Sequence, residues 1–285
     1  MMAGTSKFAK TAAAQPHPAL QALLLRPFPA VMGVLNVTPD SFSDGGKFAD
    51  PEQALAQAVR MIAEGADILD IGAESTRPYG SQPVTAEEEL RRLASILPDV
   101  VALGIPVSID TMKASVAAWA LGTGAQIAND VWGLQRDPDM ARVIADHGAP
   151  VVVMHNRDNV DADIDIMKDM AVFFARSLDI AAKANIPPAN IVLDPGIGFG
   201  KTPDQSIAAL ARLDELHEFG VPVLVGASRK RFIASVIPSE PHQRLGGSLA
   251  AHLLAAQRGA KFIRAHDVAE TVQALRVAAA IEDKR

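Results

Sequence analysis

The sequence predicts a single (β/α)8 barrel (TIM barrel), an α/β fold in which eight parallel strands form an inner ring covered by helices. Eight short runs rich in β-branched residues recur along the chain, and segments with helical periodicity and capping signals separate them. Such alternation implies parallel strands that are buried on both faces. About 255 residues follow position 30, which matches the usual barrel size of about 250 residues.

Eight segments are the strand candidates, and each ends at or near a polar residue. In chain order they are AVMGVLNVT (30–38), ILDIGA (68–73), PVSID (106–110), QIAND (126–130), VVVMH (151–155), IVLDPG (191–196), VLVGAS (223–228) and FIRAH (262–266). Their short length and composition fit the strands of a buried parallel sheet. A doubly wound open sheet is the structural alternative, because it alternates strands and helices in the same way.

Capping signals indicate where several of the intervening helices begin. Asp50 is an N-cap residue followed by a proline at the first helical position. Thr85 and Glu88 form a capping-box pattern before the next apolar stripe. Asp267 and Glu270 repeat this pattern before the last helix. No linker or low-complexity segment divides the chain after these elements begin, so we expect a flexible N-terminal tail at residues 1–28, with at most one short helix, and one catalytic domain at residues 29–285.

Composition narrows the possible function classes. The formal net charge of −6 argues against a nucleic-acid partner, because such binding relies on Lys and Arg at the phosphates. The chain has no cysteine, which excludes disulfides, thiol nucleophiles and cysteine zinc sites and fits a cytoplasmic protein. The apolar stretch at 19–25 is too short to cross a bilayer, so we expect no membrane partner.

The active site of a (β/α)8 barrel lies at the C-terminal ends of its strands. Those ends carry many polar residues in this sequence, namely Asn36, Asp70 with Glu74, Asp110, Asn129 with Asp130, His155, Asp194, Ser228 with Arg229 and Lys230, and Arg264 with His266. A strand-ending Asp or Ser often only caps the next helix, which is the interpretation we favour for Asp130 and Ser228. The remaining set predicts a ring of converging polar groups.

The residue types in this ring suggest a ligand. Asp110, Asn129 and Asp194 suit a heterocycle with adjacent N–H donors, such as a guanine or pterin ring, because a carboxylate accepts two such groups at once. Lys230 would donate to the ring's acceptors.

A second group of polar residues suits a phosphate and a metal ion. Arg264 and His266 alternate on one strand, so they point the same way and suit a phosphate or pyrophosphate. Asn36 would add an oxygen ligand for Mg²⁺, which keeps waters and substrate phosphates as its other ligands.

Seven separated segments together resemble the dihydropteroate synthase family. They are NVTPDSFSDGG, GADILDIGAESTRP, SIDT, IAND, LDPGIGFGKT, GASRK and IRAHD, in the family's order, and the resemblance runs from about residue 30 to 282. It implies an enzyme that joins 6-hydroxymethyl-7,8-dihydropterin pyrophosphate to p-aminobenzoate, releasing pyrophosphate and forming 7,8-dihydropteroate for folate synthesis. It also implies Mg²⁺ as cofactor, a homodimer and competition by sulfonamides.

The resemblance further implies a role for each matching residue. The pterin would contact Asp110, Asn129, Met154, Asp194, Phe199, Gly226 and Lys230; the pyrophosphate would contact Asn36, Arg264 and His266, with Mg²⁺ beside Asn36. The p-aminobenzoate pocket would contain Phe42, Thr76, Arg77, Pro78, Lys230 and Arg231. The catalytic residues would be Asp44, Arg77, Lys230, Arg264 and His266. Two departures stand out: Arg231 occupies a position where many members have Ser, and STRPYGSQPV is one residue longer than the common pattern.

The glycine-rich stretch LDPGIGFGKT (193–202) is not a nucleotide-binding loop. Pro195 stands where a P-loop needs its first glycine, and the spacing G-x-G-x-G also fails the dinucleotide fingerprint. We expect Asp194 to bind the pterin, the glycines to let the backbone turn close to the ring, and Lys201 to be structural.

Two other functions are compatible with a pterin-binding barrel. A pterin-dependent methyltransferase holds a folate with a similar Asp and Asn set, but such proteins work with a cobalamin partner or domain. The SRK segment together with Arg264-x-His266 favours pyrophosphate chemistry instead. A non-catalytic pterin-binding protein would have lost the loop residues Phe42, Asp44, Arg77 and Pro78, which are present here.

Overall fold

Eight parallel strands form a closed ring in the computed structural model, which describes residues 15–38, 50–74 and 84–284. The strands are β1 (Ala30–Asn36), β2 (Ile68–Gly72), β3 (Val107–Asp110), β4 (Ile127–Asp130), β5 (Val151–Met154), β6 (Ile191–Asp194), β7 (Leu224–Val225) and β8 (Phe262–Ala265). Hydrogen bonding runs in the order β6-β5-β4-β3-β2-β1-β8-β7. A parallel bridge between Leu193 and Val223 joins β6 to β7 and closes the ring, so the barrel prediction is confirmed.

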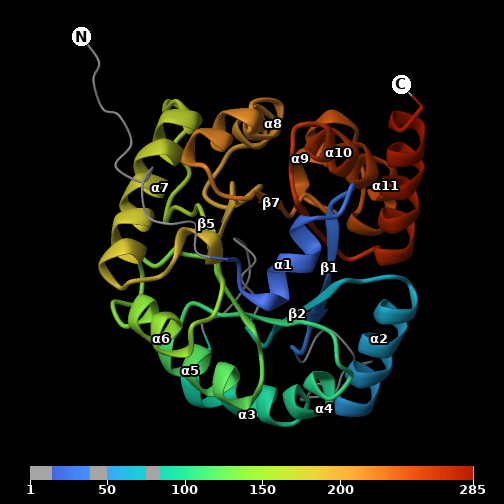
Figure 1. The fold of residues 1–285 in the computed structure, drawn as a ribbon. Coiled ribbons are helices and arrows are strands. Elements are labelled where there is room, and N and C mark those ends of the chain that lie inside the picture. Colours follow the sequence, from blue (N-terminus) through green and yellow to red (C-terminus); the bar gives the residue numbers. More distant parts are fainter. Residues whose placement is uncertain (1–14, 39–49, 75–83, 285) are drawn as a thin grey trace.

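Helices surround the strands (Figure 1). They are α1 (Pro18–Leu24), α2 (Pro51–Ala63), α3 (Ala86–Ala94), α4 (Leu97–Val101), α5 (Ala114–Thr123), α6 (Met140–His147), α7 (Ile166–Lys183), α8 (Pro203–Ala211), α9 (Arg231–Val236), α10 (Leu245–Gln257) and α11 (Val268–Glu282), with 3₁₀ turns at Pro188–Asn190, Leu213–Phe219 and Pro241–Gln243. Among the described residues, no helix is long and apolar enough to cross a membrane.

Side-chain alternation along the strands separates two regions of the interior. One apolar cluster fills the N-terminal end of the ring and contains Leu20, Ala30, Met32, Ile68, Ile127, Val152, Val192, Leu224 and Phe262. The larger cluster lies between the strands and the helices and takes the intervening residues, such as Leu69, Val151 and Ile263. Since the side-chain period of a strand is two, the next inward positions after the first cluster are Asp70, Asn129, Asp194 and Arg264.

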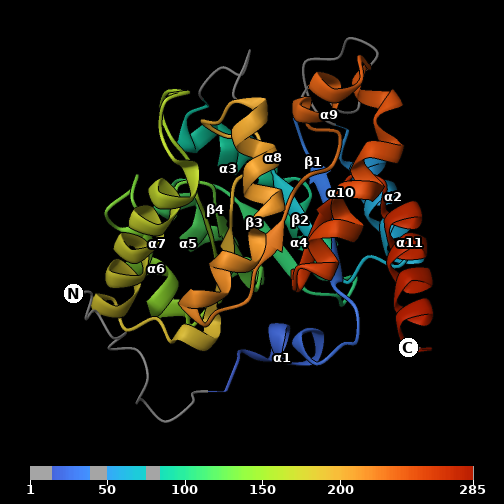
Figure 2. The same ribbon diagram turned by 90° about the horizontal axis from the view of Figure 1, so that it is seen from above.

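Helix α1 covers the N-terminal end of the barrel, opposite to α9 (Figure 2). Its Leu20 is 2% exposed and packs into the apolar cluster at that end. The backbone N–H of His17 donates to Asn190 Oδ1 at 2.9 Å and ties the helix to the connection before β6. The expected short helix is therefore present as α1, and it packs against the apolar end of the ring. Residues 1–14 lie outside the described residues.

The predicted capping signals hold at two of three helices. Asp50 accepts a hydrogen bond from Glu52 N in α2, and the Thr85 hydroxyl accepts one from Glu88 N in α3. The Glu88 carboxylate does not complete the capping box but pairs with Arg91 and Arg92. Asp267 makes no such bond at the start of α11. Its carboxylate is instead held by the guanidinium of Arg229, whose Nε donates to it at 3.0 Å. The capping prediction was wrong there because a distant cation competes for the same oxygens.

Replacing Leu20 with Ala should reduce the free energy of unfolding by about 2–3 kcal/mol, because the change opens a cavity against buried side chains. Leu25, at the end of the same helix, is 83% exposed, so Leu25→Ala is the matched control and should change stability little. Urea denaturation of the three proteins measures both effects. Equal midpoints for Leu20→Ala and the parent protein would show that α1 does not contribute to the stability of the barrel.

Candidate functional site

An ion-pair network crosses the C-terminal mouth of the barrel. Arg264 on β8 donates from Nε to Asp70 Oδ2 at 2.6 Å and from Nη2 to Asp110 Oδ2 at 2.9 Å. Asn129 Nδ2 donates to the same Asp70 oxygen at 3.0 Å. Strands β2, β3, β4 and β8 each supply one member, so the network joins half of the ring. It fixes the plane of the guanidinium and the orientation of the amide.

Burial strongly affects the charges of this network. Burial raises the pKa of Asp110, and the neighbouring Arg264 opposes that rise. Burial also lowers the pKa of Arg264, but Asp70 and Asp110 outweigh it, so the pKa of Arg264 is raised and the side chain stays charged. Within the described residues, Asp70 Oδ1 and Asp110 Oδ1 are buried oxygens with no hydrogen-bond partner. Such atoms are costly unless a donor reaches them, as the N–H groups of a bound heterocycle would.

Asp194, at the end of β6, lies beside these groups. Burial raises the pKa of Asp194, whereas the hydrogen bond from Gly196 N and the charges of Lys230 and Arg264 favour its ionised form. The bond from Gly196 N to Asp194 Oδ1 is 2.7 Å long. Gly196 has a φ of +62°, and a Cβ there would lie 2.0 Å from the carbonyl oxygen of His155, so only glycine fits this turn.

Lys230 and Phe199 form another wall of the mouth. The ammonium of Lys230 lies 4.1 Å from the centre of the Phe199 ring, which is a cation–π contact. Lys230 also acts electrostatically on Asp110 and Asp194 and favours their ionised forms. A flat ring bound between these groups would meet carboxylate acceptors on one edge and a cation on another.

His266 follows β8 beside Ser228. Its Nδ1 lies 3.0 Å from Ser228 Oγ, and its backbone N–H donates to the same oxygen at 3.2 Å. Burial, followed by the charges of Arg264 and Arg229, lowers the pKa of His266 to about 3, so the ring is neutral at neutral pH. The cations Arg264, Arg229 and Lys230 thus lie near His266, together with the carboxylate of Asp267.

The structure brings together most of the predicted site residues that it describes. Asp110, Asn129, Asp194, Phe199, Lys230, Arg264 and His266 meet at the mouth, with Met154 at the end of β5, Gly226 directly after β7 and Asn36 at the end of β1. Gly226 lies against Arg264, since a Cβ there would be 3.7 Å from Arg264 Cβ. Arg231 is the first residue of α9 and is exposed. Phe42, Asp44, Thr76, Arg77 and Pro78 lie outside the described residues.

Other strand-end residues have structural roles. His155 faces the helices rather than the mouth, with Nε2 at 3.0 Å from Asp169 Oδ2. Glu74 pairs with Lys113 and accepts from Val84 N at 3.1 Å. Asp130 accepts from the backbone N–H groups of Trp132 and Leu134 in the turn after β4. The prediction that it caps the next helix was wrong, because α6 begins only at Met140. Ser228 does not cap a helix but holds His266.

Asp70 is the site residue to which sequence reasoning gave no role. It accepts from both Arg264 and Asn129 and is fully buried. The two-residue alternation of the strand could have predicted its inward position, since Asp70 lies two residues after the inward Ile68.

A family described as "Pterin binding enzyme" matches residues 32–266, which is well over half of the chain. The chain belongs to this family. The dihydropteroate synthase of Bacillus subtilis (strain 168) is 44% identical over 255 residues, which cover 89% of this chain and 89% of that relative. The pterin-binding assignment therefore extends over nearly the whole barrel.

Solved structures of dihydropteroate synthases are similar to this chain in both fold and sequence. The Xanthomonas albilineans enzyme with 4-aminobenzoic acid has a TM-score of 0.86 and 46% identity, covering 91% of this chain and 94% of that chain. Its complex with 7,8-dihydropteroate gives a TM-score of 0.83 and 45% identity, covering 91% and 95%. The Yersinia pestis enzyme in a sulfonamide drug complex has a TM-score of 0.83 and 40% identity, covering 90% and 95%.

Replacing Asp70 with Asn should weaken binding of a pterin by about tenfold, or about 1.4 kcal/mol. The change removes the charge that orients Arg264 and Asn129 while it preserves the shape of the side chain. Titration calorimetry measures the affinity, and thermal unfolding reports whether the fold persists. The exposed Asp163 provides the control Asp163→Asn, and equal affinities for the two variants would remove Asp70 from the site.

Proposed function

We propose that this chain is a dihydropteroate synthase, a transferase that condenses 6-hydroxymethyl-7,8-dihydropterin pyrophosphate with p-aminobenzoate to give 7,8-dihydropteroate and pyrophosphate. One observation carries the proposal: buried acceptors suited to a pterin, Asp110 and Asp194, share one barrel mouth with the cationic group Arg264 and the neighbouring His266. Membership of the pterin-binding family and similarity to synthases over most of the chain support it.

Recognition of the pterin follows from the buried carboxylates. Asp194 and Asp110 accept the N–H groups of the ring, and Asn129 adds its amide. The unpartnered Asp110 Oδ1 gains a donor when the ring binds, which recovers the cost of burying that oxygen. Lys230 donates to the ring's acceptors, while Phe199 and Met154 contact its faces.

Departure of the pyrophosphate is favoured by positive charge close to it, because negative charge develops on this leaving group. Arg264 stays charged because two carboxylates face it, and it stabilises the charge that develops as the bond to the methylene carbon breaks. His266 is neutral at neutral pH, so its ring N–H can donate a hydrogen bond to a bound anion. The electron-rich dihydropterin shares the positive charge left on carbon, so we propose that pyrophosphate leaves before the amine attacks.

We propose Mg²⁺ as the cofactor, with Asn36 as its ligand. Asn36 offers a neutral amide oxygen at the end of β1, whereas the nearby Asp110 Oδ2 is already paired with Arg264. Mg²⁺ is usually bound by one or two protein oxygens and completes its shell with water and phosphate. When bound, it would neutralise charge on the leaving pyrophosphate.

The p-aminobenzoate is proposed to lie against Phe42, Thr76, Arg77, Pro78, Lys230 and Arg231, with Asp44 near the reacting carbon. Only Lys230 and Arg231 of this set are among the described residues, and they begin α9 at the mouth. The arylamine is neutral and needs no strong general base, so these residues would orient it and exclude water. Competition by sulfonamides at this position, a homodimer and a cytoplasmic location complete the proposal.

Pyrophosphate release by the purified protein, measured with and without p-aminobenzoate, tests the proposed reaction. Release that depends on p-aminobenzoate, with 7,8-dihydropteroate as product, is the expected result. Binding of the pterin compound without any release would favour a non-catalytic pterin-binding protein or a methyltransferase instead.

Lys230→Ala and Asp194→Asn should each lower kcat/KM by about tenfold or more, since each removes a charge-assisted hydrogen bond worth about 1.5–3 kcal/mol. Lys261→Ala is the control, because Lys261 is exposed and precedes β8 at the opposite end of the barrel. Circular dichroism should show intact folds. Near-normal rates for both site variants would disprove the assigned site.

Acidification should reduce pterin affinity already at pH values well above 4, although the pKa of an ordinary carboxyl group is near 4. The pKa values of Asp110 and Asp194 are raised in the folded protein, and their protonated forms no longer accept two N–H groups. On the acid side, affinity should therefore decline as pH falls through the raised pKa values of these two carboxyl groups. A binding titration from pH 7 down to pH 4 measures this, and unchanged affinity between pH 7 and pH 4 would contradict it.

A further inference from the structure

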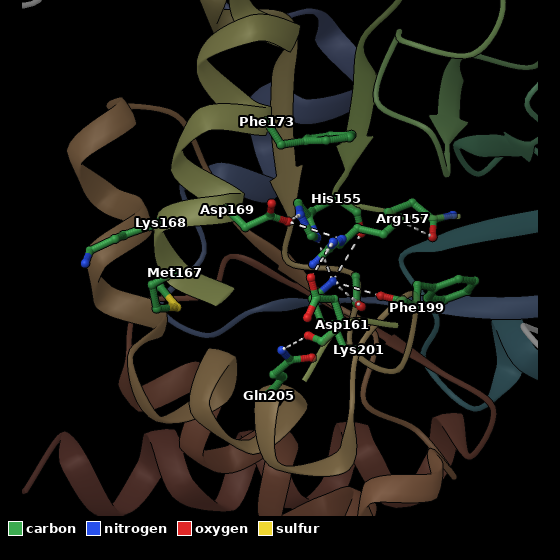
Figure 3. Close-up of polar contacts among 12 residues, drawn as sticks. His155, Arg157, Asp161, Met167, Lys168, Asp169, Phe173, Phe199, Lys201 and Gln205 are labelled. Atoms are coloured by element: carbon green, nitrogen blue, oxygen red, sulfur yellow. Dashed lines mark hydrogen bonds and ion pairs between the residues drawn. The ribbon is translucent and has the colours of Figure 1, made fainter. Parts of the chain in front are cut away.

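A second buried polar network lies beside Phe199 and joins the loops after β5 and β6 (Figure 3). Its centre is Lys201, which is 5% exposed. The ammonium donates to the carbonyl oxygens of Gly196 at 3.0 Å and Phe199 at 3.1 Å, and lies 2.7 Å from His155 Nδ1. These three acceptors occupy the buried ammonium, so it is not available for a phosphate.

The network has one consistent arrangement of protons. An ammonium has only donors, so Lys201 donates to His155 Nδ1, and the ring proton of His155 resides on Nε2. That proton is donated to Asp169 Oδ2, 3.0 Å away. Burial, together with the charges of Lys201 and Arg157, lowers the pKa of His155 to about 2, which agrees with a neutral ring. The chain of groups therefore runs from a cation through a neutral imidazole to a carboxylate.

Lys201 connects two loops that carry the pterin wall. His155 directly follows Met154 at the end of β5, whereas Gly196 and Phe199 belong to the loop after β6. The same loop returns to the site, because Gly196 N donates to Asp194 Oδ1 at 2.7 Å. The backbone N–H of His155 also donates to the carbonyl of Asp194 at 2.9 Å. The position of the Lys201 ammonium therefore affects the side chains that are proposed to contact the pterin ring.

The helix that follows holds Lys201 in place from the other side. Thr202 and Gln205 form a complete capping box at the start of α8, so the residue after Lys201 is fixed by two reciprocal hydrogen bonds. Gln205 Nε2 also donates to the carbonyl oxygen of Asp161 at 2.6 Å. The lysine therefore projects from a rigid helix start rather than from a free loop.

We propose that Lys201 is a positioning residue for pterin recognition: its ammonium joins the loops after β5 and β6 in the binding conformation, and its positive charge helps to keep Asp194 ionised. The inference rests on the proposed function, since it concerns the same pterin site. Lys201 touches neither substrate nor reacting atoms. It acts through Asp194, Phe199 and the Gly196 turn.

The charges around Lys201 give the proposal a pH signature. Burial lowers the pKa of Lys201 to about 7; Asp194 and Asp169 oppose this, while Lys230 and Arg157 lower the pKa further. Asp194 in turn faces Lys201, Lys230 and Arg264, which all favour its ionised form. As pH rises through the pKa of Lys201, the ammonium loses its charge, so pterin affinity should weaken on that side. On the acid side, affinity should weaken as Asp194 takes up a proton.

The test is a calorimetric titration of pteroic acid into the full-length protein from pH 5 to pH 9. Lys201→Met should weaken binding about tenfold at pH 6.5, move the acid decline to higher pH and abolish the decline near pH 7. Lys201→Arg, which keeps the charge, should restore part of the affinity. Lys168→Met is the matched control, because Lys168 is an exposed lysine of α7 near the same network, with an 85% exposed side chain.

Two outcomes would overturn the inference. A folded Lys201→Met protein with the affinity and pH profile of the parent would show that Lys201 is merely structural. Should that variant fail to fold, Asp169→Asn provides the second test. It removes a charge that raises the pKa of Lys201, so the alkaline decline should move to lower pH, and an unmoved decline would overturn the proposal. A parent protein that does not bind pteroic acid would instead refute the proposed function.

Discussion

The closed ring of short parallel strands is the constraint on which the rest of the molecule depends. Because each strand alternates its side chains, closure sends one set of residues inward and the next set toward the helices. Apolar residues fill the inside at the N-terminal end, which α1 covers. At the other end the same inward positions carry Asp70, Asn129, Asp194 and Arg264. A shift of one residue in any strand would exchange a site residue for a core residue.

Charges at the mouth are tolerated because they neutralise one another. Arg264 alone would be costly inside a barrel, but Asp70 and Asp110 both face it, and Asn129 completes the set. Pairing leaves two carboxylate oxygens without donors among the described residues. The protein thus retains an incomplete hydrogen-bond network that a ligand with N–H groups can complete. Stability and recognition depend on the same side chains.

The two polar networks share the wall formed by the ends of β5 and β6. Met154 and Asp194 face the mouth, whereas His155 faces the helices and meets Lys201. The glycine-rich loop passes between them, and its positive φ values allow the backbone to approach both. In this arrangement the lysine of a stretch that resembles a P-loop points into the protein, toward carbonyl oxygens and an imidazole, and is not available for a phosphate.

The amino-acid sequence by itself determined the barrel, the strands and most of the mouth residues, because strand period, capping residues and strand-end polar groups are local properties. The tertiary structure alone decided which groups pair. Asp70 holds Arg264 although they lie 194 positions apart, Arg229 takes Asp267 away from its helix cap, and α1 packs against an end of the ring that no local pattern reveals. His155 and Met154 are adjacent in sequence, yet strand geometry places them in different networks. Such contacts depend on ring closure, which brings distant strands together.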